Sequence, residues 1–361
     1  MEKRTVIPFG PQHPVLPEPI HLDLVLEDET VVEAIPSIGF VHRGLEKLVE
    51  KREFTEYVYV AERICGICSF MHGMGYCMSV EHIMNIQVPD RAQFLRTIWA
   101  ELGRIQSHTL WLGLLADAMG FESLFMHSWR LREKILDIFD MTVGGRLIHS
   151  VCKIGGVRRD IDGEMFKKVI SILDEFQNSL HDATDVFLND NSVAYRMKGL
   201  GILSTQAAAD LGTVGPMARA SGIETDMRKV VGYAAYPYVK FEVPIAAEGD
   251  CLARTAVRIR EIFESIHIIR QCIELIPSDS TIDVKVTGVP NGEFFARLEQ
   301  PRGEVLYYSK GNGTRFLDRM RVRTPTFANL PALLHTLPGV GLADVPMLIL
   351  TIDPCISCTE R

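Results

Sequence analysis

Two pairs of cysteines, each separated by two residues, are the part of this sequence most suited to chemistry. The first pair is Cys65-Gly66-Ile67-Cys68, and the second is Cys355-Ile356-Ser357-Cys358. A two-residue spacer lets both sulfurs of a pair reach one ion, and four thiolates suit zinc, copper(I), iron-sulfur centres or nickel. From the spacing alone, a structural four-cysteine zinc site is as good an interpretation as a catalytic metal.

The length of chain between the pairs separates these two interpretations. Residues 69 to 354, nearly the entire protein, lie between them. Zinc ribbons close over a short intervening segment, and a stabilising clamp rarely needs so large a scaffold. A buried catalytic metal does need one, so the separation favours a catalytic centre built from both ends of the chain.

The remaining cysteines, Cys77, Cys152, Cys251 and Cys272, show no paired spacing. We expect them to be small buried hydrophobic residues rather than ligands. No thiols are then left for an iron-sulfur cluster in this chain.

Composition narrows the class of protein. The 361 residues are 47% hydrophobic, enough for one large domain or two intimate ones. The net charge of -8 argues against a nucleic-acid partner, because phosphate binding needs clustered Lys and Arg, and the only basic run is the short segment 315–323.

Nothing in the sequence predicts insertion into a membrane. No stretch approaches the roughly 18 to 20 apolar residues that span a bilayer, and the first ten residues lack the apolar core of a secretory signal. We therefore expect a cytoplasmic chain, in which reducing conditions favour free or metal-bound thiols over disulfides.

Hydrophobic periodicity predicts an α+β fold. Apolar and polar residues alternate over 20–35 around a polar turn, which predicts a β-hairpin. Spacings of three and four residues predict long helices over 90–119, 163–188 and 252–276. A Gly-rich connection over 199–222 lies between the second and third of these helices. Connections of this length in a compact protein more often have a function than not.

Alternation returns after residue 278 and predicts strands over 281–289, 293–298 and 304–308, followed by an apolar run over 347–352. The expected architecture is a central bundle of long helices flanked by small α+β lobes made from both termini. We divide it into a β-rich lobe (1–52), a helical core with the first cysteine pair (53–277), and an α+β lobe with the second (278–361).

The residues around the cysteines resemble a known family. Arg63-Ile64-Cys65-Gly66-Ile67-Cys68 with His72 is similar to the first nickel-binding signature of [NiFe] hydrogenase large subunits, and Asp353-Pro354-Cys355-Ile356-Ser357-Cys358 with Arg361 is similar to the second. Four further segments resemble its energy-converting, Ech-type branch and the homologous complex I subunit: 8–14, 42–46, 155–160 and 301–304.

The resemblance implies a nickel-iron centre held by the four cysteines. Cys65 and Cys355 would be terminal nickel ligands, and Cys68 and Cys358 would bridge nickel to an iron that carries carbon monoxide and two cyanides. Four thiolates offset the charge of the metals, which is consistent with this assignment.

The resemblance also implies roles for groups around the metals. Cys355 would accept the first proton and Glu18 would relay it, although Glu18 could instead be an exposed loop acid. Arg302 and Asp353 would form an outer pair over the metals, with Arg302 as a turn residue the alternative. His72 would hydrogen-bond a bridging thiolate, with a buried structural histidine as its competitor.

One departure concerns a second metal ion. Many relatives end the second motif in a histidine that, with a glutamate matching Glu46, binds magnesium or iron, but this chain has Arg361. A guanidinium is not a metal ligand at ordinary pH, so we do not predict that ion.

As a whole, the resemblance implies reversible reduction of protons to H2. The implied partners are a small subunit with a [4Fe-4S] cluster, a ferredoxin-like electron-transfer subunit, ferredoxin, and integral membrane subunits that translocate ions. The complex would lie on the cytoplasmic face of the membrane. Two other hypotheses stay open: a quinone-pocket subunit of complex I, which should lack the cysteine pairs, and a structural protein with a zinc clamp.

Overall fold

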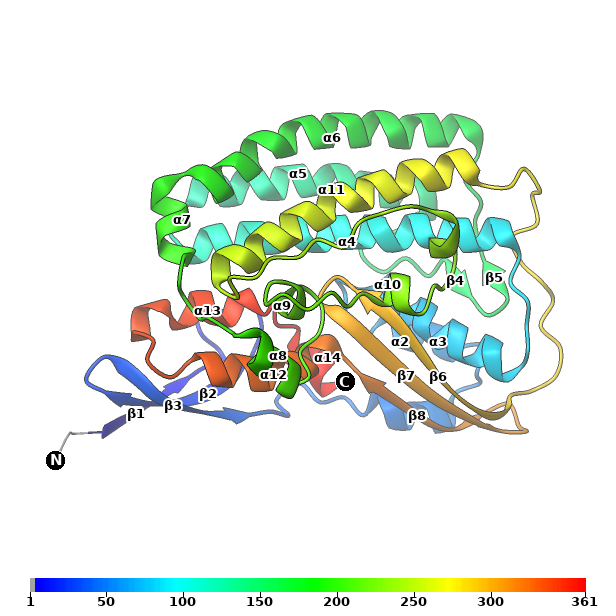
Figure 1. Cartoon of the computed structure of the whole chain (residues 1–361). Helices are drawn as coiled ribbons and strands as arrows, with labels where there is room; N and C mark the ends of the chain where they lie inside the picture. The colour runs from blue at the N-terminus through cyan, green and yellow to red at the C-terminus, as the bar shows by residue number, and fades with distance from the viewer. Residues whose placement is uncertain (1–3) are drawn as a thin grey trace.

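A computed structural model describes residues 4–361, and Figure 1 shows α3 (Ser69–Ile83) and α14 (Ile356–Glu360), the helices next to the two cysteine pairs, below a layer of long helices. The first element is an antiparallel sheet of β1 (Arg4–Phe9), β2 (His21–Glu27) and β3 (Thr30–Ser37). Strands β2 and β3 are the hairpin predicted from alternation. Its turn needs a left-handed residue, and Asp28 takes that conformation with φ of 53°.

Four long helices form the upper layer in Figure 1: α4 (Asp90–Ala118), α5 (Glu122–Val143), α6 (Gly163–Asn189) and α11 (Cys251–Leu275). Three of them match the predicted helices to within two residues at each end, and α5 has no counterpart among the predictions. Helix α4 packs against both α5 and α11, and it is buried over most of its length. It is therefore the innermost member of the bundle.

The first cysteine pair lies between short helices that pack on a second antiparallel sheet. The chain passes through α1 (Leu45–Leu48), the 3-10 turn η1 (Val49–Lys51) and α2 (Tyr57–Glu62) to α3 (Ser69–Ile83). Helix α3 contacts β6 (Asn291–Gln300) and β7 (Gly303–Asn312), which are followed by β8 (Leu317–Arg323). The second pair comes after α12 (Pro325–Thr336), η3 (Leu342–Asp344) and α13 (Val345–Thr351), at the start of α14 (Ile356–Glu360).

The predicted strand over 281–289 is wrong. The segment makes only an isolated bridge at Asp283 to Gly156, with hydrogen bonds from Val157 N to Ile282 O (3.0 Å) and from Val284 N to Gly155 O (3.0 Å). Its neighbours β4 (Cys152–Lys153) and β5 (Gly156–Val157) have two residues each, so pairing has no edge along which to extend. Alternation alone did not supply a partner strand.

The connection over 199–222 is not a simple loop. It contains α8 (Thr205–Asp210) and α9 (Pro216–Arg219), and it lies between α7 (Asn191–Met197) and the later α10 (Met227–Val230) and η2 (Tyr236–Tyr238). The end of this connection is buried, and it passes against the β6–β7 turn at Gly215. These elements together confirm the predicted α+β class.

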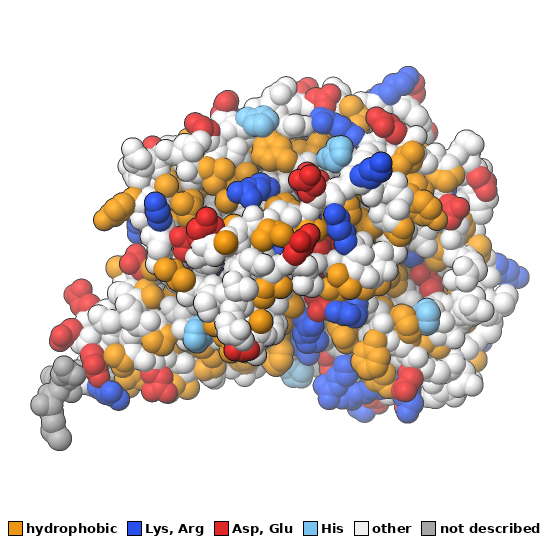
Figure 2. Space-filling view, viewed as in Figure 1, with side chains coloured by type: hydrophobic (Ala, Val, Ile, Leu, Met, Phe, Trp, Pro, Cys, Tyr) orange, Lys and Arg blue, Asp and Glu red, His pale blue; other side chains and the backbone are white. Residues whose placement is uncertain are grey.

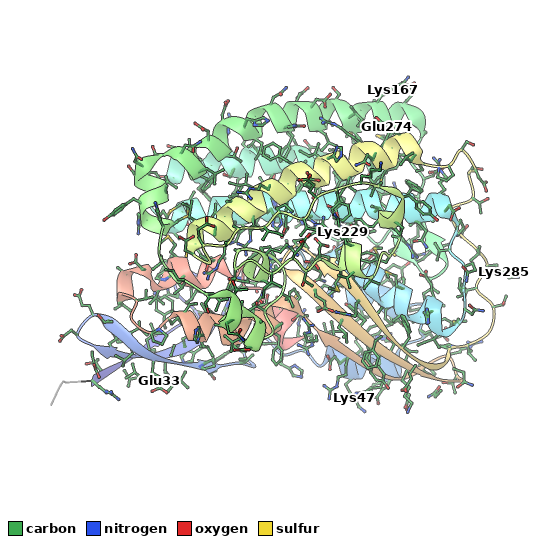
Figure 3. The ribbon with its side chains drawn as sticks, in the orientation of Figure 1. Glu33, Lys47, Lys167, Lys229, Glu274 and Lys285 are labelled. Carbon is green, nitrogen blue, oxygen red and sulfur yellow. The ribbon has the colours of Figure 1, made fainter. Side chains whose placement is uncertain are left out.

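The visible surface mixes charge and apolar groups, and a group of Lys and Arg side chains lies along the lower edge below β8 (Figure 2). In Figure 3, Lys47 at this edge, Glu33 on the first sheet and Lys167 on α6 point outward. The arginines of the basic run are ion-paired: Arg315 with Glu53, Arg319 with Glu50, Arg321 with Glu46, and Arg323 with Glu304. Within residues 4–361, no helix has the length and apolar character needed to cross a membrane.

A buried ion pair joins α3, α4 and the β4–β5 hairpin. Arg96 donates to both carboxylate oxygens of Glu81, at 2.9 and 2.6 Å, and Glu81 also accepts from Gly155 N at 2.7 Å. The same guanidinium donates to the carbonyl oxygens of Lys153 and Gly156. The pair therefore supports the helix that begins at the first cysteine motif.

We predict that Glu81→Ala lowers the free energy of unfolding by about 3–5 kcal/mol, because it leaves the buried guanidinium of Arg96 without its counter-charge. Glu164→Ala is the control, since Glu164 pairs with Lys167 on the exposed face of α6 and should change stability little. Denaturant titration followed by circular dichroism measures both. Equal midpoints for the two variants would contradict the role given to the buried pair.

Candidate metal centre

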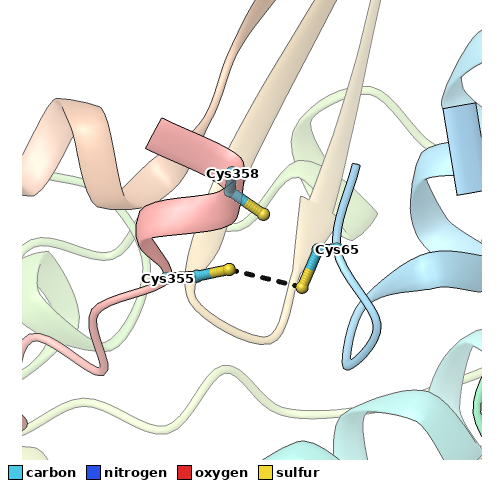
Figure 4. Close-up of side chains that lie close together, drawn as sticks. All are labelled: Cys65, Cys355 and Cys358. Carbon is cyan, nitrogen blue, oxygen red and sulfur yellow. Dashed lines mark hydrogen bonds between the residues drawn. The ribbon is translucent and has the colours of Figure 1, made fainter. Parts of the chain in front are cut away.

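The two ends of the chain bring four cysteine sulfurs together in the interior. The Sγ atoms of Cys65 and Cys355 lie 3.3 Å apart, and those of Cys68 and Cys358 lie 3.6 Å apart. Figure 4 shows Cys65 on the loop before α3 facing Cys355 and Cys358, which belong to the start and body of α14. All four side chains are buried and none forms a disulfide.

These donors fit soft metal ions. The sulfurs of Cys65, Cys355 and Cys358 lie within 4.8 Å of one another, as do the sulfurs of Cys68 and Cys358 with a ring nitrogen of His72. Four sulfurs arranged as two close pairs can hold one ion or two adjacent ions, and thiolates suit nickel and iron as well as zinc. The arrangement is therefore compatible with a bimetallic centre.

Backbone N–H groups fix the sulfur of Cys65. Ile67 N and Cys68 N donate to it at 3.3 and 3.4 Å, at the point where α3 begins. Free N–H groups at a helix start stabilise negative charge, so this position favours a thiolate. Hydrogen bonds from Cys355, Cys358 and Cys68 hold the pKa of Cys65 well below its usual range.

Helix α4 holds both cysteine motifs from above. Gln106 donates to Ile67 O at 2.6 Å, and Arg132 of α5 fixes the Gln106 amide through its oxygen at 2.9 Å. Trp111 donates to Leu350 O at 2.6 Å, near the end of α13 and just before the second motif. Each contact joins a backbone carbonyl beside one cysteine motif to a buried α4 side chain, so α4 helps to set where both motifs lie.

Arg302 and Asp353 form a pair at the second motif. Arg302 Nη2 forms an ion pair with Asp353 Oδ1 at 2.8 Å, and Arg302 Nε donates to Asp353 O at 2.7 Å. Asp353 has φ of 53°, a strained conformation for a residue with a side chain, which the two contacts hold in place. Among residues 4–361, Arg302 Nη1 and Asp353 Oδ2 have no hydrogen-bond partner, so one donor and one acceptor remain for other groups.

The turn that carries Arg302 is itself tightly held. Arg104 of α4 donates to Gln300 O at 3.1 Å and to Glu299 O at 2.8 Å. On the other side, a Cβ atom at Gly215 would lie 2.4 Å from Arg302 O, so only glycine permits this approach. The long connection between α7 and α11 thus contributes directly to the site.

His72 contacts the metal-ligand candidates from α3. Its Nε2 lies 3.2 Å from Cys358 Sγ, and its Nδ1 lies 2.5 Å from the hydroxyl of Tyr307 on β7. Burial lowers the pKa of His72 to about 4, so the ring is neutral. With the Tyr307 hydroxyl donating to Nδ1, the Nε2–H group donates to the sulfur.

Glu18 lies against the second motif and is half-buried rather than an exposed loop acid. Its Oε2 accepts from Ile356 N and, at 3.2 Å, from Ser357 N. Burial raises the pKa of Glu18 and the negative charge of Cys65 raises it further, whereas Arg302 and the two N–H groups lower it. The result is a carboxyl group with a raised pKa beside the thiols, which suits reversible proton transfer.

Glu46 and Arg361, the two residues considered for a second ion, contact each other directly. Glu46 Oε1 accepts from Arg361 Nε and Val322 N, both at 2.9 Å, and Oε2 accepts from Arg321 at 2.9 Å. These contacts lower the pKa of Glu46 against the opposing effect of its burial. Both carboxylate oxygens are therefore engaged by protein groups.

Comparison with known proteins places this geometry in a family. Residues 118–287 and 280–361 match the model of the 49 kDa subunit of respiratory-chain NADH dehydrogenase, and residues 43–118 match that of nickel-dependent hydrogenases. The carbon monoxide-induced hydrogenase of Rhodospirillum rubrum is 39% identical over 98% of this chain and 99% of its own length. The chain belongs to the family that joins hydrogenase large subunits to the 49 kDa subunit of complex I.

Other relatives in this family differ in their described activities. The alpha subunit of the membrane-bound hydrogenase of Pyrococcus furiosus is 35% identical, covering 98% of this chain and 87% of that one. A subunit of the F420H2 dehydrogenase of Methanosarcina mazei is 36% identical, covering 99% and 97%. A chain of the archaeal membrane-bound sulfane sulfur reductase complex has the same fold, with a TM-score of 0.95, 31% identity, and coverage of 99% and 98%. The Pyrococcus furiosus relative and the sulfane sulfur reductase chain are thus described as parts of membrane-bound assemblies.

The structure adds site residues that the motifs did not indicate. Gln106, Trp111 and Arg104 hold backbone carbonyls, and Tyr307 holds His72, through contacts between residues far apart in sequence. The one available signal was the alternation over 304–308, which puts Tyr307 on the buried face of its strand.

Glu62 is another such residue, three positions before Cys65. Its Oε2 accepts from Ser150 N and Oγ, both at 3.0 Å, while Oε1 has no partner among residues 4–361. A Cβ atom at Gly73 of α3 would lie 2.8 Å from Glu62 Cγ, so glycine makes room for this carboxyl group. Burial raises the pKa of Glu62 from 4.5 to about 7, partly offset by Ser150.

We predict that stability falls between about pH 4.5 and pH 7 through Glu62. Its pKa is higher in the folded state, so its stabilising contribution is complete below pH 4.5 and is lost as the pH rises through 7. The loss amounts to roughly 3 kcal/mol, from the difference between the two pKa values. Glu62→Gln stays neutral and should lack this decline; denaturation midpoints at pH 5 and pH 8 that fall equally in both proteins would refute it.

Proposed function

We propose that this chain is the catalytic subunit of an energy-converting [NiFe] hydrogenase that interconverts protons and H2. Electrons come from reduced ferredoxin through the iron-sulfur clusters of partner subunits, and membrane subunits couple the reaction to ion translocation. The observation that carries the proposal is the convergence of four buried sulfurs from opposite ends of the chain. A complex I subunit without metal chemistry has no need of such a set.

The two close sulfur pairs support the ligand roles. Cys65 and Cys355, at 3.3 Å, would be the terminal nickel ligands, and Cys68 and Cys358, at 3.6 Å, would bridge nickel to iron. When bound, the nickel-iron centre, with carbon monoxide and cyanide on its iron, supplies the two-electron chemistry of H2. The protein holds the ligands, excludes water from the buried site and moves the proton.

Proton transfer needs a base at the metals and a carrier beyond it. Cys355 Sγ is the proposed first base. The proton then passes to the carboxyl group of Glu18, which Ile356 N and Ser357 N hold in place by donating to its Oε2. The raised pKa of Glu18 makes it a better proton acceptor than an exposed carboxyl group.

Arg302, Asp353 and His72 set the electrostatics of the site. The unpartnered Nη1 of Arg302 can donate to a ligand on the metals, and Asp353 fixes the orientation of the guanidinium. His72 donates to Cys358 and lowers the negative charge on a bridging sulfur.

Metal analysis of the purified complex tests the proposal. Nickel and iron in equal amounts, with infrared bands of iron-bound carbon monoxide and cyanide, support it. Zinc alone would favour a structural clamp, and no metal would favour a quinone-pocket subunit like those of complex I. Activity with reduced ferredoxin, and ion uptake by sealed vesicles, then test the finer statements.

We predict that Cys65→Ser retains less than a tenth of the nickel and of the H2 turnover, because a neutral hydroxyl is a far poorer ligand than a thiolate. Cys272→Ser is the control, since that cysteine is buried in α11 away from the other sulfurs. Inductively coupled plasma mass spectrometry and H2 evolution measure both. Full nickel content in the Cys65 variant would remove it from the ligand set.

We predict that Glu18→Gln keeps both metals but slows hydrogen/deuterium exchange by about 10²-fold or more, the usual effect of removing an acid-base group. The amide preserves the size of the side chain and an oxygen acceptor for Ile356 N and Ser357 N. Mass spectrometry of HD and H2 under D2 gives the rate. An unchanged rate in a fully loaded variant would exclude Glu18 from the relay.

A further inference from the structure

Arg43 makes an unusual set of contacts next to the metal centre. Its Nη1 donates to Arg63 O at 3.0 Å, and its Nη2 donates to Ile64 O at 2.9 Å and to Ser357 O at 2.9 Å. The first two carbonyls directly precede Cys65, and the third lies between Cys355 and Cys358. One guanidinium thus bridges two segments whose cysteines lie about 290 positions apart in the sequence.

The backbone around Arg43 is anchored independently of the cysteines. Arg43 precedes the short helix α1, where Gly44 takes φ of 66°, a conformation that suits glycine. Tyr57 donates to Leu45 O at 2.6 Å, and Glu46 accepts from Val322 N of β8 at 2.9 Å. The arginine therefore extends from a fixed base toward both loops.

The Ser357 peptide is held from both sides. Glu18 accepts from its N–H group, while Arg43 donates to its carbonyl oxygen. The first cysteine loop has a similar arrangement, with Gln106 donating to Ile67 O from α4 and Arg43 donating to Arg63 O and Ile64 O. Of these groups, Arg43 is the one that contacts both loops.

We propose that Arg43 is a positioning residue that clamps the two cysteine loops together, so that the four sulfurs are already close before any metal binds. A planar guanidinium with several fixed donors suits three carbonyl oxygens in different directions. A lysine could reach one or two of them and should restore part of the function. A glutamine carries no positive charge and is too short to bridge the loops.

Sulfur proximity in the metal-free full chain tests the clamp without relying on the proposed function. After brief oxidation with diamide, mass spectrometry of peptides measures how fast Cys65–Cys355 and Cys68–Cys358 crosslinks form in the wild type, Arg43→Gln and Arg43→Lys. Arg315→Gln is the matched control, because Arg315 is an exposed arginine that pairs only with Glu53 through its side chain. Circular dichroism checks that each variant is folded.

We expect crosslinking to slow by about tenfold in Arg43→Gln, the factor that corresponds to loss of one hydrogen bond from a charged donor. Arg43→Lys should fall between this variant and the wild type, and Arg315→Gln should match the wild type. Equal rates in all four folded proteins overturn the clamp. If Arg43→Gln does not fold, the Arg43→Lys rate decides, and a rate equal to the wild type counts against the proposal.

The second measurement, in the assembled complex, rests on the proposed function. There we expect Arg43→Gln to lose nickel faster than the wild type during chelation and to shift the infrared bands of the retained metal, with partial recovery in Arg43→Lys. A wild type without nickel would refute the hydrogenase proposal but leave the crosslinking result valid. A nickel-loaded wild type with unchanged Arg43 variants in both measurements would refute the clamp alone.

Discussion

Buried polar side chains of a single helix determine where the site residues lie. Arg104, Gln106 and Trp111 of α4 hold the Arg302 turn, the first cysteine loop and the end of α13 through backbone carbonyl oxygens. Seven residues of helix span about 10 Å, so three distant chain segments are fixed relative to one rigid rod. A buried carbonyl without a donor is costly, which makes each of these contacts a strong constraint on its segment. The long-helix bundle thus serves mainly to present α4 and to shield it from water.

The site around Arg302 and the four cysteines is buried, so its positive and negative charges must balance. Arg302 is almost wholly enclosed, and the charges of Asp353, Cys355, Cys68 and Cys65 raise its pKa well above the usual range against the effect of burial. An isolated buried cation would be strongly unfavourable, so the guanidinium needs both the aspartate and negative charge on the sulfurs. Four full thiolates would exceed that balance. Bound divalent metals would restore it, so the electrostatics that hold Arg302 in place are compatible with the proposed metal centre.

The motifs and the periodic elements could be predicted from the sequence, but few of the contacts between them could. Spacing of Cys65, Cys68, Cys355 and Cys358 was enough to predict a shared site, and three-residue and four-residue periodicity located three of the four long helices. Alternation failed at 281–289, because a strand also needs a partner and the two-residue β5 offers almost none. Gln106, Tyr307 and Arg43 act through atoms that lie far away in sequence, and no local pattern distinguishes a buried glutamine that holds a loop from one that does not.

The Glu46–Arg361 contact places a carboxylate and two guanidinium groups beside the end of the second cysteine motif. A carboxylate at this place must be compensated, since it lies below the surface beside the last turn of the second motif. Arg361 and Arg321 supply two permanent positive charges, equal to that of a divalent ion, and Val322 N adds a third donor. A guanidinium forms directional hydrogen bonds, so it fixes the end of α14 in one orientation relative to β8. These directional contacts therefore restrict where the second cysteine motif can lie relative to the second sheet.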